Sequence, residues 1–227
     1  MRRARSFTRA VAEKPARLAQ AFYALSIMNP PRPLQRNEID TAATTLAAAF
    51  EGDPLFQFLL PDASTRPAWL AWIQGQALRE ALACGGALTP AEGPQVGAIG
   101  LFPIGAWPPA IGQTIAAAGW LPGLPSFRLV RWGLHLENAC RKRHPSDRHV
   151  YIHVLGVDPA QKGRGFGGVL IRHACSMADE AGVIAHLETA NSVNLPLYRR
   201  FGFDVVEEIT SHGGPPVWTM TRPRPNA

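Results

Sequence analysis

The sequence predicts a single α/β domain, and three observations lead to this fold class. A chain of 227 residues, of which 46% are hydrophobic and 18% charged, is long enough to bury one substantial core. β-Branched, aromatic and aliphatic residues at 151–157 predict a strand, which the turn pair Asp158-Pro159 ends. At 169–181 the apolar residues follow the period of a helix, and Gly182 is placed to end it.

The other elements follow from the same patterns. Prolines in residues 28–36 leave room for one short strand, and Asn37 or Asp40 can cap the helix after it. Gly52-Asp53-Pro54 breaks that helix, and a short apolar segment at 55–60 comes next. The helices are expected at 41–50, 67–83, 127–143, 165–181 and 194–200, and further strands at 85–89, 95–102 and 184–189.

Positive charge is concentrated at the start of the chain. The formal net charge is +6, but residues 1–27 hold six basic residues against one acidic residue, so residues 28–227 are nearly neutral. We expect a basic extension at 1–27 and a single domain at 28–227. Three interpretations of the extension remain open: a start site placed too early with Met28 as the initiator, a loosely docked arm, or a functional basic arm.

The composition argues against several classes of protein. The three cysteines are widely spaced and form no Cys-x-x-Cys pair, so neither a zinc knuckle nor a disulfide framework is predicted, and no metal is expected. No apolar run has transmembrane length, and a nearly neutral domain predicts no nucleic-acid partner. We expect a cytoplasmic protein with reduced thiols and no membrane association. Its oligomeric state stays open, a homodimer included.

The turn between the strand and the helix is the most informative segment. Four glycines lie in it, and because glycine lacks a Cβ atom their main-chain N–H groups can approach an anion closely. The turn opens a helix, whose N-terminus also attracts negative charge. Lys162 and Arg164 add positive charge. The glycines are Gly163, Gly165, Gly167 and Gly168.

Several interpretations of this turn compete. A dinucleotide site fits G-x-G-x-x-G with Glu188 twenty residues after Gly168, but a doubly wound domain needs more β/α units than the roughly forty residues after Glu188 can supply. A nucleotide P-loop needs Gly-Lys-Ser/Thr, which is absent from the sequence. A coenzyme A pyrophosphate cradle and a turn that merely packs strand against helix both remain.

The segment after the next strand favours the coenzyme. The sequence resembles the GNAT superfamily of N-acetyltransferases in two motifs that have the right order and spacing. The glycine turn resembles the acetyl-CoA motif Q/R-x-x-G-x-G/A, although Lys162 replaces the usual Gln or Arg. The second motif, N-x(6)-Y-x(3)-G-F, is matched by Asn191, Tyr198, Gly202 and Phe203. Segments at 45–62 and 213–222 also resemble the puromycin N-acetyltransferase group of bacterial enzymes.

The resemblance carries expectations about fold and activity. It implies a GNAT fold, in which a central mixed, mostly antiparallel twisted sheet of about seven strands is flanked by helices, with splayed strands at the acetyl-CoA site. It implies transfer of an acetyl group from acetyl-CoA to a primary amine of a small molecule, by direct attack within a ternary complex. A module that binds acyl-CoA without turnover, and a protein or peptide N-acetyltransferase, remain as alternatives.

The resemblance also implies which residues hold the coenzyme. The splayed strand is expected to offer main-chain groups to the pantetheine arm, and the turn to hold the pyrophosphate. Asn191 and Asn194 carry amides that either bind pantetheine or cap the next helix. The coenzyme-binding residues are expected to be Leu155, Gly156, Val157, Lys162, Gly163, Arg164, Gly165, Phe166, Gly167, Gly168, Asn191, Asn194 and Tyr198.

Two residues are candidates for proton transfer. Tyr198 matches the tyrosine that many GNAT enzymes place near the coenzyme sulfur, and a phenol is protonated at neutral pH and can donate to a thiolate; its alternative role is packing. Glu188 is the candidate general base, because apolar neighbours can raise the pKa of a carboxylate. Its rival roles are holding a cationic amine and ordering the nearby loop.

Acceptor choice is expected to depend on residues 103–148. Trp107, Trp120 and Trp132 lie there, as core packing or as walls of an acceptor pocket. His153 and His186 are interpreted as structural, hydrogen-bonded histidines. A basic cluster at the end of the helix suits the helix dipole, and we expect its side chains to be solvated and outside the site. Its members are Arg141, Lys142, Arg143, His144 and Arg148.

Overall fold

The computed structural model describes residues 29–110, 112, 114, 117, 119–210 and 213–225. The expected basic extension at 1–27 and the candidate initiator Met28 lie outside the described residues. Within the part that is described, no helix is both long enough and apolar enough to cross a membrane.

A seven-stranded sheet with the order β1-β2-β3-β4-β5-β7-β6 forms the centre of the domain. All neighbouring strands pair antiparallel except β4 and β5, which are parallel. The predicted mixed, mostly antiparallel sheet is therefore confirmed. The strands are β1 (Arg32–Pro33), β2 (Ala87–Thr89), β3 (Gly97–Phe102), β4 (His149–Val157), β5 (Ile184–Thr189), β6 (Asp204–Ile209) and β7 (Val217–Arg222).

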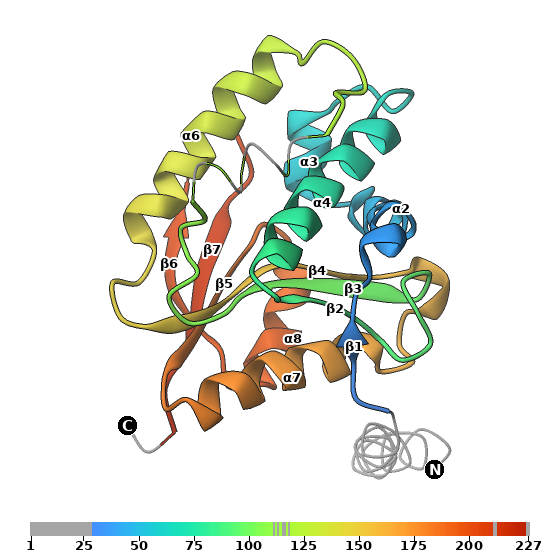
Figure 1. Ribbon diagram of the computed structural model, residues 1–227. Helices are drawn as coiled ribbons and strands as arrows, with labels where there is room; N and C mark the ends of the chain where they lie inside the picture. The colour runs from blue at the N-terminus through green and yellow to red at the C-terminus, as the bar shows by residue number, and fades with distance from the viewer. Residues whose placement is uncertain are drawn as a thin grey trace, which may run out of the picture.

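Helices cover both faces of the sheet (Figure 1). In that view α2, α3 and α4 lie above it, α7 and α8 lie below it, and α6 extends beside β6 and β7. The α-helices are α2 (Ile39–Phe50), α3 (Pro54–Leu59), α4 (Arg66–Ala83), α6 (Phe127–Arg143), α7 (Phe166–Glu180) and α8 (Leu195–Arg199), and the 3-10 helices are η1 (Arg36–Glu38), η2 (Pro159–Gln161) and η3 (Ser192–Asn194).

Most element types agree with the sequence prediction, and the cap of the first helix does not. Neither Asn37 nor Asp40 caps α2. Instead η1 precedes it, and the side chains of Gln35 and Glu38 form a capping box around that turn. The apolar segment after the break forms α3, with Asp53 as its N-cap and Pro54 in its first turn. Gly182 follows α7 at φ +64°, as expected for a glycine that ends a helix.

A β-bulge in β4 divides the core into two faces. Gly100 pairs with Val154 and Leu101 pairs with Ile152, so His153 has no partner residue in β3. An extra residue in one strand reverses which face the following side chains occupy. Ile152 accordingly packs in the cluster of α7, whereas Val154 packs in the cluster of α2 and α4.

β4 and β5 separate after the bulge. Their parallel pairing covers His149 to Ile152 and ends at the pair Ile152–Leu187. From Val154 to Val157 β4 pairs with β3, and among the described strands it has no partner on its other side. The splayed strands expected of this fold are therefore present, and they leave β4 main-chain groups facing the gap.

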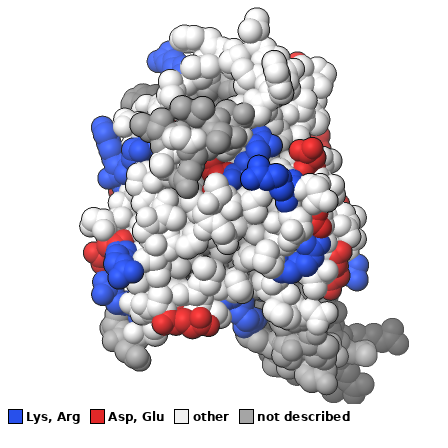
Figure 2. Space-filling model, in the orientation of Figure 1, with Lys and Arg blue, Asp and Glu red and all other residues white. Residues whose placement is uncertain are grey.

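Charged side chains are interspersed on the surface. On the face in Figure 2, basic and acidic residues are scattered among uncharged ones and do not gather into one large patch of either sign. This distribution agrees with the nearly neutral charge of residues 28–227.

Replacement of Gly156 by alanine should destabilise the domain. A Cβ there would lie 2.6 Å from Cδ2 of Leu46 and 3.1 Å from Cβ of Ala49, so α2 would have to move. We expect a loss of about 1–3 kcal/mol in the free energy of unfolding, measured in urea. Gly133→Ala is the control, since nothing lies within 4 Å of a Cβ there and alanine in a helix gains roughly 0.5–1 kcal/mol. Equal effects of the two changes would contradict the close packing at Gly156.

Candidate active site

The glycine turn follows β4 through η2. Oδ1 of Asp158 accepts a hydrogen bond from the Ala160 main-chain N at 2.6 Å, which folds the chain back after the strand. Gly163 and Gly165 then adopt φ values of +84° and +96°. Residues with a Cβ are strained in this left-handed region, so these two positions require glycine.

α7 starts with free donors. Gly165 is its N-cap and makes no side-chain cap hydrogen bond. The Val169 main-chain N bonds to the Gly165 oxygen at 3.1 Å, and the N–H groups of Phe166, Gly167 and Gly168 precede the first intrahelical bond. Together with the positive end of the helix dipole they form a place for an anion. The side chains of Lys162 and Arg164 are exposed at its rim.

The end of β4 is continuous with this turn. Gly156 lies against Leu46 and Phe50 of α2, where no larger residue would fit. A Cβ on Gly167 would lie 3.6 Å from Cγ2 of Val157, an ordinary contact, so the start of α7 packs directly on the strand. The fold therefore places Leu155, Gly156 and Val157 beside the turn and beside the gap between β4 and β5.

Tyr198 lies in α8 and is buried, with 7% of its surface exposed. Its ring packs edge-on against Phe203, with centroids 6.1 Å apart. Burial raises the pKa of Tyr198 to about 12, and the negative charge of Asp53 adds to this effect. Asp53 itself is buried, and burial raises its pKa as well. The phenol is therefore protonated throughout the neutral range, and sequence reasoning missed Asp53 because it interpreted Gly52-Asp53-Pro54 only as a helix break.

The two asparagines before Tyr198 differ. Oδ1 of Asn191 accepts the Val193 main-chain N at 3.1 Å, which is the capping role. Asn194 is the N-cap residue of α8 and makes no side-chain cap hydrogen bond. Of the two side-chain amides, only that of Asn194 makes no capping hydrogen bond and can bind a ligand.

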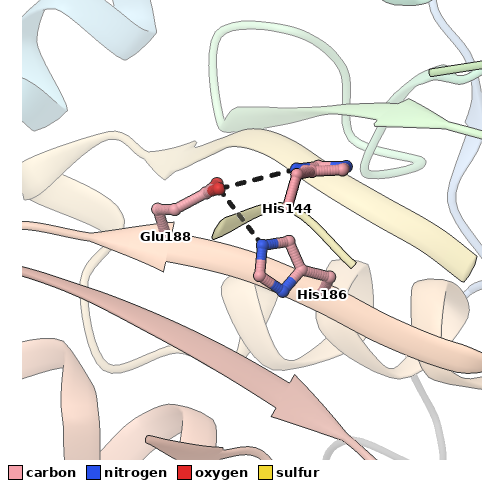
Figure 3. A group of neighbouring side chains, drawn as sticks. All are labelled: His144, His186 and Glu188. Atoms are coloured by element: carbon pink, nitrogen blue, oxygen red, sulfur yellow. Dashed lines mark hydrogen bonds and ion pairs between the residues drawn. The ribbon is translucent and has the colours of Figure 1, made fainter. Parts of the chain in front are cut away.

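A second group of side chains lies where β4 and β5 are still paired. His186 and Glu188 alternate with the core residues Ala185 and Leu187, so they point to the opposite face. Tyr151 and His153 of β4 and His144 after α6 join them. Oε1 of Glu188 lies 3.1 Å from Nε2 of His186 and 3.8 Å from Nδ1 of His144 (Figure 3).

The pKa of Glu188 shifts in the direction opposite to the expected one. Burial by itself raises this pKa, but hydrogen bonds from His144 and His186, with the charge of His186 and the Tyr151 hydroxyl, lower it to about 2. The expectation of a raised pKa is therefore wrong, because it considered apolar sequence neighbours and not the donors that the fold brings in. Glu188 is ionised at neutral pH and is a weak proton acceptor.

His144 was expected to be solvated with its basic neighbours, and this is wrong. Only 7% of its side chain is exposed. Its ring lies 5.0 Å from that of Trp107 and 4.7 Å from that of Tyr151, measured between centroids. The chain leaves α6 at His144 with extended backbone angles, φ −63° and ψ 135°, which turns the residue toward the sheet. By contrast Arg143 stays near the surface, paired with Glu207 at 2.7 Å.

The three tryptophans of residues 103–148 have separate roles. Trp107 packs on Phe102 and Tyr151, with centroids 5.1 and 4.8 Å apart, and so forms part of the wall around His144. Trp132 packs on Phe58 at 5.2 Å. Trp120 is fully exposed. Of these three tryptophans, only Trp107 has a described ring contact with Tyr151 or His144.

A second buried carboxylate faces this group from α4. Oε2 of Glu80 lies 4.0 Å from Nε2 of His153, and 9% of the Glu80 side chain is exposed. Burial raises the pKa of Glu80, and burial lowers that of His153. Sequence reasoning did not single out Glu80, because its approach to β4 depends on how α4 crosses the sheet.

Comparison with known families identifies the segment that holds these elements. Residues 117–203 match the model of the acetyltransferase (GNAT) family. This range includes α6, β4, the glycine turn, α7, β5 and α8.

Two curated relatives match over short segments. The chain is 42% identical over 55 residues to N-alpha-acetyltransferase RimI of Mycobacterium tuberculosis, which is 24% of this chain and 35% of that protein. It is 38% identical over 63 residues to mycothiol acetyltransferase of Mycolicibacterium vanbaalenii, which is 24% of this chain and 21% of that protein. The chain thus spans about a third and a fifth of the length of these relatives.

A solved structure shares the fold over nearly the whole chain. It is described as histone acetyltransferase HPA2 and related acetyltransferase, from Corynebacterium glutamicum, and it is 20% identical to this chain. The match has a TM-score of 0.61 and covers 88% of this chain and 100% of the other.

Proposed function

Because residues 117–203 match the model of the acetyltransferase (GNAT) family, we propose that the chain is an acetyl-CoA-dependent N-acetyltransferase that acts on a primary amine of a small molecule. One observation supports this most. The uncapped start of α7 follows directly on the part of β4 that has lost its partner β5, so an anion site and an open strand edge form one continuous surface.

The coenzyme binds along this surface. The main-chain donors from Gly163 to Gly168 hold the pyrophosphate, with Lys162 and Arg164 adding charge at the rim. The pantetheine arm lies in the gap between the strands and bonds to main-chain groups of Leu155, Gly156 and Val157, replacing the strand partner that β4 lacks there. Asn194 reaches the arm from α8, whereas Asn191 is engaged as a cap.

Acetyl transfer then proceeds by direct attack. The amine nitrogen forms a bond to the thioester carbonyl carbon, and the carbonyl oxygen takes up negative charge that main-chain donors of β4 stabilise. Collapse of this intermediate breaks the carbon–sulfur bond. Tyr198 donates its proton to the departing thiolate. Main-chain donors suit the oxyanion because they are rigid and need no reorganisation.

The acceptor occupies the face lined by the second group of side chains. Glu188 is ionised there and Glu80 is buried nearby, while Trp107 and Tyr151 supply aromatic surface. Negative charge beside aromatic rings favours an amine that arrives as a cation. Glu188 holds the ammonium and accepts its proton, directly or through water; its low pKa makes the holding role the stronger of the two.

A peptide N-terminus is the second candidate acceptor. It is favoured by one observation, the 42% identity over 55 residues to a protein named N-alpha-acetyltransferase. A module that binds acyl-CoA without turnover is disfavoured by the presence of both Tyr198 and Glu188, which binding alone does not require.

Thiol release from acetyl-CoA tests the proposal. With a panel of aromatic amines, aliphatic diamines and short peptides, we expect release that depends on one of the small amines and a matching acetylated product by mass spectrometry. Release with peptides alone would replace the acceptor class. Binding of acetyl-CoA with no release from any acceptor would support the module and sink the enzyme.

Replacement of Tyr198 by phenylalanine should lower kcat by about a hundredfold or more, since general acid catalysis contributes roughly 10²–10⁴. The ring packing on Phe203 is kept, so the KM for acetyl-CoA and the thermal stability should change little. Burial raises the pKa of Tyr198 to about 12, so the protonated form persists up to that pH, and ionisation of Tyr198 should cause no loss of wild-type rate below about pH 10. An unchanged kcat in the variant would exclude the general-acid role.

Glu188→Gln should lower kcat/KM for the amine by about 10²-fold, from loss of charge and of proton acceptance. Because holding is the stronger role, we expect the larger part of this loss in the KM for the amine. Glu180→Gln at the exposed end of α7 is the matched control and should leave both constants unchanged. If Glu188→Gln behaves like this control, the residue has no part in the reaction.

A further inference from the structure

His144, His186 and Glu188 bring three potential metal ligands together. Nδ1 or Nε2 of each ring and a carboxylate oxygen all lie within 4.8 Å of one another. The residues come from two places, the end of α6 and strand β5, and their ligand atoms converge on one point (Figure 3). All three side chains are largely buried, with 7%, 1% and 12% exposed for His144, His186 and Glu188.

The neighbouring His149 determines which nitrogen of His144 faces Glu188. Nδ1 of His149 lies 2.6 Å from the Asp147 carbonyl oxygen, which can only accept, so this nitrogen carries the proton. With Nδ1 protonated, Nε2 is the acceptor of the neutral His149 ring. Nε2 of His144 lies 2.7 Å from that atom and donates to it. Nδ1 of His144 is therefore the nitrogen that faces Glu188.

Nδ1 of His144 and a carboxylate oxygen of Glu188 face each other at 3.8 Å. A metal ion between these two atoms would replace the ring proton that otherwise links them. His186 completes the set. Its Nδ1 lies 3.2 Å from Oγ1 of Thr221, which can accept a proton from the ring and leave Nε2 free as a ligand.

We propose that His144 Nδ1, His186 Nε2 and Glu188 Oε1 bind a divalent transition-metal ion of the Zn²⁺ type. Two imidazoles and one carboxylate are a ligand set that Zn²⁺ prefers, with a fourth position left for water. Ligand atoms around tetrahedral Zn²⁺ lie roughly 3.4 Å apart, close to the 3.1 and 3.8 Å found here. Each imidazole already has a partner on its other nitrogen, which is how metal-bound histidines are oriented.

Occupation of this site has a consequence for catalysis, and this part rests on the proposed function. The ion takes the carboxylate oxygen that would hold the incoming amine. It also adds positive charge beside a cationic acceptor, which weakens binding. Bound Zn²⁺ therefore inhibits acetyl transfer, and a chelator restores the rate.

Binding is measured on the full chain without a histidine tag, after removal of metal with a chelator. Calorimetric titration with ZnCl₂ should give one site, and Co²⁺ as a probe should give visible absorption bands of a tetrahedral complex. His144→Ala and Glu188→Gln should each weaken Zn²⁺ affinity by more than the 10–100-fold that loss of an orienting partner costs. His149→Phe, which removes only that partner, should weaken it by about 10–100-fold.

His135→Ala is the matched control, because His135 is exposed on α6 and outside the group. It should bind Zn²⁺ as the wild type does. Circular dichroism identifies any variant that fails to fold. Because the two ligand variants are independent, one that folds is enough to test the metal site. The proposal would be overturned if the wild type bound Zn²⁺ no more tightly than the folded ligand variants do. A proton, and not a metal ion, would then link His144 and Glu188.

A kinetic arm separates this proposal from the proposed function. Zn²⁺ should slow thiol release by the wild type. It should not change the rate of the His144→Ala variant when that rate is compared with the same variant's rate without metal. The comparison is made at equal product concentration because released coenzyme A also binds Zn²⁺. If no amine supports thiol release, the proposed function fails while the titration still decides the metal site. If thiol is released and Zn²⁺ does not bind, the metal site alone fails.

Discussion

The separation of β4 from β5 is the constraint on which the other features of the domain depend. β4 pairs with β3 from Tyr151 to Val157, apart from His153 at the bulge, but it keeps β5 only as far as Ile152. The bulge at His153 lies at this boundary and turns Val154 toward α2 and α4. Buried main-chain groups need partners, so a strand edge left open inside the domain is costly unless a ligand covers it. The same boundary divides the glycine turn and the open edge of β4 from the group of histidines and carboxylates.

The buried charge of Glu188 shows how this division is stabilised. A carboxylate with 12% of its side chain exposed would lose much of its hydration, and an unpaired one would become protonated instead. His186, His144 and Tyr151 provide enough donors to keep it ionised. The donors come from a strand, a helix end and the neighbouring strand, so the charge is maintained only when these three elements are packed together.

Local physics allowed much of the fold to be predicted from sequence. The strand, glycine turn and helix at 151–181 depend on side-chain period and on positive φ at Gly163 and Gly165, which short segments specify by themselves. The cap of α2 failed because Gln35 and Glu38 form an alternative cap that single-residue preference does not reveal. The sequence also predicted the end of β4 and the glycine turn as neighbours, and the start of α7 packs on Val157 of that strand.

The surroundings of Glu188 were predicted less well from the sequence, for a physical reason. Glu80, Trp107 and His144 lie 71, 44 and 7 residues before Tyr151 in the sequence, and each reaches it through the packing of a different element. The pKa of Glu188 depends on His144 in the same way. The residue pattern of a single helix or strand does not indicate contacts between distant segments. Neither the neighbours of Glu188 nor the burial of His144 could therefore be inferred from spacing.

The glycine turn presents main-chain donors, whereas the group around Glu188 presents side chains. Changes of side chain around the turn leave the backbone donors in place as long as Gly163 and Gly165 keep their conformation. The opposite wall consists of side chains, and Glu80, Trp107 and His144 come from unconnected segments. Substitutions there can change the shape and charge of that surface one at a time without disturbing the backbone of the turn.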